Sequence, residues 1–367
     1  MESQPFDQNL GYKLEVPIPN LNDRRCKDGI GTGNSYLIED VLSEKESQNI
    51  FRNIDNEIKW GEMSHKGGLV PRLVCNQGSI YCNSNATELH SSSDTFIPVY
   101  RHPAANPPPL IAWTAHVSKV KEIAEQICGH PLNHALIQLY RSGDDYISEH
   151  ADKTLDIMEG SYICNYSCGA KRTMILRAKK GARGHNRKNN LIHSDESIKD
   201  DCNLSKKEKK EIENKLEEDR KNLRIPMHHN SLFLLDPHTN RYMLHSIKRD
   251  KRPLCEKSKE ELREGGARIS ITFRWIHTFE RQSDGLLFGG GSRRKEVKVN
   301  EEKCQISIDC SDGPFKNDSY DNDATDIKED GEEMLIGFSK ENTEADTFDW
   351  CKVYGSGFDA KEAPNFI

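Results

Sequence analysis

Six short segments rich in β-branched and aromatic residues constrain the fold of this chain more than any other feature. Each is bounded by Gly, Pro, Asp or Asn, residues that commonly end strands and form turns. Two predicted helices precede the series, so we predict an α+β fold: a double-stranded β-helix (jelly-roll) core with supporting N-terminal helices. The predicted strands are residues 134–141, 161–167, 172–177, 231–236, 242–247 and 268–279.

The two predicted helices show apolar residues along one face. The first covers about residues 43–60, where Ser43 and Glu46 have the spacing of a capping box. The second covers about residues 111–128, and Gly129 stands where a helix would end.

The polar composition indicates that the chain does not pack throughout. Apolar residues make up 35% and charged residues 30% of the sequence, which is polar for a fully folded chain of this length. We expect a flexible N-terminal arm over 1–33 and a domain over 34–280 with a polar insertion at about 179–228. A mostly disordered acidic tail over 281–347 and an aromatic segment over 348–367 follow. The aromatic segment could dock on the domain or bind a partner.

Charge is unevenly distributed along the chain. Residues 301–350 contain sixteen Asp or Glu and four Lys, while residues 171–188 contain eight Lys or Arg and no acid. A basic body with an acidic tail is compatible with nucleic acid as a partner that binds the basic 171–188 region. The alternative is that both segments are simply solvated.

Other global features bear on location. The sequence has no run of about 18 apolar residues, so we expect no membrane span. Its N-terminus lacks the pattern of a signal peptide. The eleven Cys lack paired CxxC spacing and are interpreted as reduced thiols. We therefore expect the nucleus or the cytoplasm. The sequence sets no oligomeric state, and a monomer is compatible with it.

A possible metal centre consists of two histidines and one aspartate. A non-haem Fe(II) oxygenase binds iron with two imidazoles and one carboxylate, which leaves the opposite face open. His150 and Asp152 form a His-x-Asp pair after a predicted strand, and His245 lies in a later one. A second pair within residues 193–195 lies in the polar insertion without a flanking strand, so we interpret it as chance.

Two arginines on the predicted strand RISITFR support this interpretation. Arg268 and Arg274 share one face by the two-residue period, although Ile269, Ile271 and Phe273 between them are apolar. A buried arginine must meet an anion, and its planar fork suits the distal carboxylate of a dicarboxylate cosubstrate. The alternative is a solvent-facing pair on a half-buried strand, which the upstream histidines and aspartate disfavour.

Four stretches of the sequence carry a family resemblance. QLYRSGDDYISEHAD, SYICNYSCGAKRTMILR, SLFLLDPHTNRYMLHSI and ARISITFR resemble the AlkB family of Fe(II)- and 2-oxoglutarate-dependent dioxygenases over about residues 70–280. The chain is most similar to the nucleic-acid dealkylating branch and its fungal relatives. The later segments GLLFGGGS and FDWCKVYGSGFD are also similar to those relatives.

This resemblance implies roles at individual positions. His150, Asp152 and His245 match the ligands of Fe(2+). Arg268 matches the residue that pairs with the distal carboxylate of 2-oxoglutarate. Arg274 matches a second arginine near the other end of the cosubstrate and the target pocket.

Other positions match the family in part. Tyr140 matches a tyrosine that donates a hydrogen bond to the cosubstrate. Gln138 and Ser270 stand where the family often has asparagine, and both can still form hydrogen bonds. We expect them to contribute to cosubstrate binding.

Three residues are weaker candidates for substrate binding. Arg72, in Val-Pro-Arg, resembles the Pro-Arg element of the family's substrate lid, although an ordinary turn has the same pattern. Tyr100 and His102 precede a proline-rich loop and could stack on a base, although packing is the commoner role of such residues.

The resemblance implies an enzyme that uses Fe(2+), 2-oxoglutarate and O2 for oxidative demethylation of alkylated nucleic-acid bases in DNA or RNA. Fold and iron site do not fix the substrate, so a protein or small-molecule hydroxylase is an alternative. A vestigial binding module is a third, which the complete ligand set disfavours.

Overall fold

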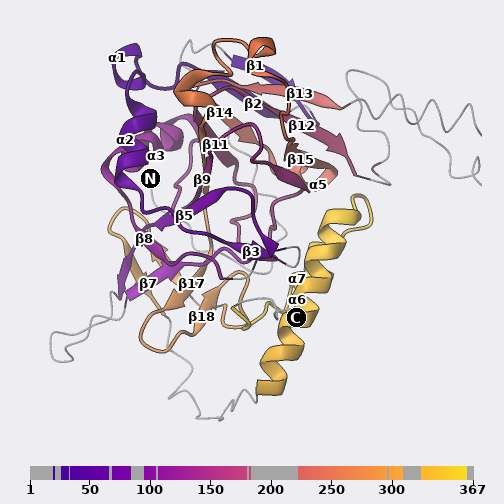
Figure 1. The fold of residues 1–367 in the computed structure, drawn as a ribbon. Helices are drawn as coiled ribbons and strands as arrows, with labels where there is room; N and C mark the ends of the chain where they lie inside the picture. Colours follow the sequence, from indigo (N-terminus) through magenta and orange to yellow (C-terminus); the bar gives the residue numbers. More distant parts are fainter. Residues whose placement is uncertain are drawn as a thin grey trace, which may run out of the picture.

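The largest element of the computed structural model is an eight-stranded sheet (Figure 1). Its strands are antiparallel except β5 and β8, which pair in parallel. In spatial order they are β1 (Cys26–Ile30), β2 (Ser35–Glu39), β14 (Ser231–Leu235), β11 (Ile163–Gly169), β16 (Arg268–Arg274), β9 (His134–Tyr140), β5 (Leu73–Gly78) and β8 (Leu110–Ala112). The structure describes residues 20, 26–32, 34–65, 68–83, 95–104, 106–179, 182, 222–295, 297–308 and 324–361.

A second, four-stranded antiparallel sheet packs against one face of the first. Its order is β10 (Ile147–His150), β15 (Met243–Ile247), β12 (Arg172–Ala178) and β13 (Leu223–Met227). Apolar side chains of both sheets share one buried core, in which Phe233 and Leu235 meet Met174, Leu176 and Met227. Two sheets that are antiparallel apart from the β5–β8 pair, together with helices, agree with the predicted α+β class, and their common core is what a jelly roll requires.

Helices cover the other face of the large sheet. They are α1 (Glu44–Ser47), α2 (Ile50–Glu57) and α3 (Ala115–Cys128). The apolar residues of α2 and α3 pack with those of β9, β11 and β16. The predicted first helix is divided at Asn49, the N-cap of α2. Its capping box forms, since the Ser43 side chain accepts from the backbone of Glu46 and the Glu46 side chain accepts from the backbone of Ser43. Gly129 ends α3 in the left-handed conformation, as predicted.

A third sheet lies below the large one in Figure 1. Its order is β18 (Leu287–Gly289), β17 (Thr278–Arg281), β7 (Thr95–Pro98), β6 (Tyr81–Asn83), β20 (Gln305–Ser307) and β19 (Lys298–Asn300). The remaining elements are β3 (Ser64–His65), β4 (Gly68–Leu69), α5 (Pro237–Tyr242), α6 (Ala324–Thr343), α7 (Trp350–Tyr354) and the short helices η2 (Leu254–Glu256) and η3 (Arg263–Gly266).

The prediction that residues 281–347 are mostly disordered is wrong for the described part of that range. Residues 281–308 contain the last residue of β17 and three further strands of the third sheet, β18, β19 and β20, and α6 follows. A few buried apolar side chains, such as Phe288, Ile306 and Phe338, anchor these elements. The composition of this range does not reveal these apolar residues, because acidic residues are abundant. A helix or strand that buries one face and exposes the other can have the same polar composition as a disordered segment.

The aromatic C-terminal segment packs against the domain. Phe348, Tyr354 and Phe358 form a buried cluster with Leu155 and with Phe338 of α6. At the other end of the chain, β1 places the last part of the predicted arm in the large sheet. Most of the predicted polar insertion, including the second His-x-Asp pair within 193–195, lies outside the described residues. Within the described chain, none of the helices has the length and apolar character needed to cross a membrane.

Candidate metal centre and its pocket

One cavity of about 260 Å³ lies between the two antiparallel sheets. Alternate residues of β16 and β9 line it, while the residues between them enter the helix-facing core. This is the two-residue period predicted for RISITFR. The lining side chains of these strands are Leu136, Gln138, Tyr140, Arg268, Ser270, Thr272 and Arg274.

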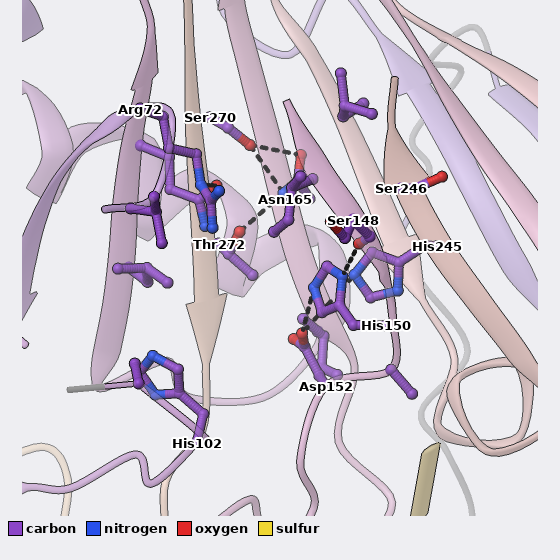
Figure 2. Close-up of a pocket in the computed structure, with 18 of the residues that line it drawn as sticks. Arg72, His102, Ser148, His150, Asp152, Asn165, His245, Ser246, Ser270 and Thr272 are labelled. Atoms are coloured by element: carbon purple, nitrogen blue, oxygen red, sulfur yellow. Dashed lines mark hydrogen bonds and ion pairs between the residues drawn. The ribbon is translucent and has the colours of Figure 1, made fainter. Parts of the chain in front are cut away.

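His150, Asp152 and His245 meet at one side of this cavity (Figure 2). His150 ends β10 and stands directly opposite His245 in the β10–β15 pairing. The Nε2 atoms of both histidines lie 3.8 Å from Oδ1 of Asp152. One ligand atom from each residue lies within 4.8 Å of the others, close enough to hold a single metal ion.

Neighbouring groups fix the orientation of these side chains. Nδ1 of His150 lies 2.8 Å from the backbone oxygen of Ser148, so donation there leaves Nε2 free as a ligand. Arg274 donates to Oδ2 of Asp152 at 3.1 and 2.7 Å, which leaves Oδ1 toward the histidines. Asn240 exchanges two hydrogen bonds of 2.9 Å with the backbone of Asp152.

The electrostatics give a donor set suited to a divalent metal. Burial, together with the neighbouring His245, lowers the pKa of His150 to about 3. Burial also lowers the pKa of His245. Burial raises the pKa of Asp152, but Arg274 and the two histidines outweigh it and hold that pKa below its ordinary value. Two neutral imidazoles and one carboxylate form the facial set typical of non-haem Fe(II) oxygenases.

Arg268 is a buried cation whose described partners are all neutral. It is 1% exposed, and its Nε donates to Ser167 at 2.8 Å. Its Nη2 lies near the oxygens of Asn165 and Ser270, and its Nη1 has no partner among the described residues. Burial lowers the pKa of Arg268 to about 10, so it remains protonated at neutral pH. An orphaned donor on a buried arginine fits the carboxylate of a dicarboxylate cosubstrate.

Gln138, Tyr140 and Arg72 form a connected group in the cavity wall. Oε1 of Gln138 accepts from the hydroxyl of Tyr140 and from Nε of Arg72, both at 3.0 Å. Arg72 also donates to the backbone oxygen of Tyr146 and is buried. The structure thus places Arg72 beside the two expected cosubstrate residues, whereas the sequence pointed to a substrate lid.

Two further predicted residues have side-chain partners in the cavity wall. Ser270 lines the cavity but is bonded to Asn165 of β11, which also donates to Thr272 at 2.9 Å. Arg274 lines the same cavity and pairs with Asp152, which places it beside the metal ligands.

Tyr100 and His102 both line the cavity. The ring of Tyr100 stacks on His102, and the guanidinium of Arg274 lies 3.9 Å from its centre. Its hydroxyl accepts from the backbone of Lys153 at 3.0 Å. These contacts hold the Tyr100 ring in the cavity wall, and its stacking on a base stays a prediction. The Nε2 atom of His102 is buried without a hydrogen-bond partner among the described residues.

Several residues of the site escaped the sequence interpretation. Asn165 could have been found, since it alternates with apolar residues on β11 and faces the cavity. Asn240 and Asn342 carried no comparable signal, because they approach Asp152 from α5 and α6.

The described part of the basic 171–188 region is occupied by internal contacts. Arg172 and Lys179 are buried and donate to backbone oxygens. Lys171 pairs with Glu260 and Arg177 with Glu149. These four cations therefore stabilise the fold, and the other four lie outside the described residues.

Comparison with known proteins identifies the family. Residues 34–274 match the 2OG-Fe(II) oxygenase superfamily. A mouse (Mus musculus) protein named DNA oxidative demethylase ALKBH2 is 26% identical over 243 residues, covering 64% of this chain and 77% of that protein. The Arabidopsis thaliana protein of the same name is 25% identical over 272 residues, covering 72% and 73%. Among solved structures, OsALKBH1 gives a TM-score of 0.33 at 13% identity, covering 66% of this chain and 96% of that chain, a likeness too weak to bear on the fold.

These relatives confirm the resemblance to the AlkB family, and the donor set of the cavity fits the cofactors of the superfamily. The chain belongs to the 2OG-Fe(II) oxygenase superfamily as an AlkB-type dioxygenase that uses Fe(2+), 2-oxoglutarate and O2.

Proposed function

We propose that this dioxygenase oxidatively removes alkyl groups from nucleic-acid bases, with DNA as the first substrate to test. The observation that carries the proposal is one cavity that joins the His150–Asp152–His245 cluster to a buried Arg268 with an orphaned donor. Relatives named DNA oxidative demethylase support the choice of substrate.

In this proposal each residue has a defined task. His150, His245 and Oδ1 of Asp152 hold the iron, and Arg274 keeps Asp152 ionised and oriented. Arg268 binds the distal carboxylate of 2-oxoglutarate. The bound iron, with 2-oxoglutarate and O2, supplies the power to hydroxylate a C–H bond.

The remaining wall residues shape the cosubstrate end of the cavity. Tyr140 and Arg72 both donate to the side chain of Gln138, and these hydrogen bonds fix their positions beside Arg268. Ser270 and Asn165 continue this polar wall. Preorganised donors of this kind bind an anion without first having to be ordered.

The opening of the cavity is where we place the target base. His65, Val70 and Pro71, from β3 and the segment after β4, line the cavity together with His102. Dealkylation requires the base to leave the helical stack, because its reactive group is otherwise out of reach. In this proposal the base accepts or donates a hydrogen bond at Nε2 of His102, which has no hydrogen-bond partner among the described residues.

We further propose that the two antiparallel sheets are the halves of a double-stranded β-helix, and that the enzyme acts in the nucleus. The common core and the shared cavity support the first point. The names of the DNA-acting relatives support the second.

The deciding experiment incubates methylated single- and double-stranded DNA and RNA oligonucleotides with the enzyme, iron, ascorbate and 2-oxoglutarate. Mass spectrometry should show loss of the methyl group from at least one DNA substrate, and none with His150→Ala. Succinate formation without demethylation of any oligonucleotide would instead favour a protein or small-molecule hydroxylase. Demethylation of RNA alone would overturn the choice of DNA.

A further inference from the structure

Side chains from distant parts of the chain accept from four consecutive backbone N–H groups of the loop that carries Asp152. The backbone N–H groups of Ala151, Asp152, Lys153 and Thr154 donate to the side chains of Asn342, Asn240, Tyr100 and Glu341, at 3.1, 2.9, 3.0 and 3.0 Å respectively. Four consecutive donors satisfied in this way leave the loop dependent on those partners for its position.

Two of the four partners are adjacent residues near the end of α6. Oδ1 of Asn342 also accepts from Nζ of Lys153 at 2.5 Å, and Oε1 of Glu341 also accepts from the Thr154 hydroxyl at 2.5 Å. The helix therefore forms hydrogen bonds with the loop on both sides of Asp152. Figure 1 shows α6 as a long helix at one side of the molecule.

The orientation of Asn342 follows from its partners. A backbone N–H and a lysine ammonium are both donors, so the amide oxygen must face them. Asn342 also lines the cavity, although it lies well beyond the matched family range of 34–274.

Glu341 is built into the structure as a buried acid. It is 3% exposed and lies near two buried lysines, Lys153 and Lys179. Its second carboxylate oxygen accepts from Tyr354 at 2.9 Å, and its backbone oxygen accepts from Lys179 at 2.5 Å. Burial of a carboxylate is costly without such partners, and these donors offset that cost.

We propose that Glu341 and Asn342 are positioning residues of the metal centre, through which the C-terminal helix holds the Asp152 loop in its metal-binding geometry. This inference rests on the proposed role of Asp152 as an iron ligand. The catalytic unit then extends past residue 280, because α6 supports the metal site from outside the two sheets.

The test measures Mn(II) affinity of the full chain by equilibrium titration, together with hydrogen exchange of the peptide containing residues 151–154. Asn342→Leu keeps the shape but removes the acceptor, whereas Asn342→Asp keeps the acceptor. We expect Asn342→Leu and Glu341→Ala to weaken Mn(II) binding about 10-fold, as loss of a ligand-orienting partner does. Both should accelerate exchange in the loop, and Asn342→Asp should behave as wild type.

Arg293→Ala supplies the matched control for helix docking. Arg293 pairs with Asp330 of α6, and its other described hydrogen bond goes to Asp359, outside the loop 151–154. It should leave Mn(II) affinity and loop exchange unchanged. If Arg293→Ala and Asn342→Leu lower the Mn(II) affinity equally, the loss comes from weaker docking of α6 in general, and the positioning role is wrong. Asn342→Ala replaces Asn342→Leu if the latter does not fold.

Asp152→Ala separates this inference from the proposed function. If Asp152→Ala leaves Mn(II) affinity intact, the proposed metal ligand itself fails. If Asp152→Ala abolishes binding while Asn342→Leu and Glu341→Ala match wild type in affinity and exchange, the positioning role alone is overturned.

Discussion

Arg268 carries its positive charge among neutral partners, and its role can be tested by one substitution. Arg268→Met keeps the apolar stem but removes every donor. Charge-assisted hydrogen bonds contribute about 1.5–3 kcal/mol each, so we expect 2-oxoglutarate affinity to fall by about 10- to 100-fold. Calorimetric titration of 2-oxoglutarate into the Mn(II)-loaded enzyme measures this, and unchanged affinity would exclude Arg268 as the carboxylate partner.

Arg274 differs from Arg268 in having an acidic partner. Arg274→Met leaves Asp152 without its orienting cation, and we expect Mn(II) affinity to fall by about 10-fold. Arg268→Met should leave Mn(II) affinity unchanged, so each variant is the control for the other. If Arg274→Met lowered the affinity for 2-oxoglutarate and left the Mn(II) affinity unchanged, Arg274 would act on the cosubstrate, as the family resemblance implies, and would not orient Asp152.

Strand β16 contributes polar residues to the cavity on one face and apolar residues to the core on the other. The apolar residues contribute to the free energy of unfolding of the protein. Ile271 is fully buried among residues of β9, β11 and the helices. Ile271→Ala should lower the free energy of unfolding by about 2–5 kcal/mol, because the cavity cannot fully collapse. Leu69→Ala is the control, since Leu69 is 64% exposed and should change stability by less than about 0.5 kcal/mol. Urea denaturation compares the two, and equal effects would contradict the assigned core.

At the scale of the whole molecule, the second sheet meets α6 at a junction where Lys179 is buried. Burial, opposed by Glu341, lowers the pKa of Lys179 from 10.5 to about 8. Above pH 8 the folded chain releases a proton that the unfolded chain keeps until about pH 10.5. The contribution of this lysine to the free energy of unfolding therefore rises with pH in that window and is constant below it.

Lys179→Met removes this titration. The free energy of unfolding of wild type relative to Lys179→Met should increase between pH 8 and pH 10, as measured by denaturant titration at each pH. Other lysines and tyrosines titrate in both proteins and cancel in the difference. Parallel curves would show that Lys179 keeps its ordinary pKa in the folded protein.

Parts of this architecture were predictable because they are local. The alternation in RISITFR fixes which side chains share a face, whatever the neighbouring strands are. The capping box at Ser43 and the left-handed Gly129 likewise depend on residues within one turn. The tail was mispredicted because the few apolar anchors of α6, such as Phe338, carry little weight in an acidic composition.

The sequence by itself determined the strand-rich core, the pairing of His150 with Asp152, and the side of β16 from which Arg268 and Arg274 project. Tertiary structure alone decided that Arg274 meets Asp152 while Arg268 meets neutral groups. It also decided that Asn342, 191 positions from Ala151, supports the metal loop. The physical reason is that a periodic pattern specifies a face, whereas the partner on that face depends on strand order and on helix docking across the whole chain.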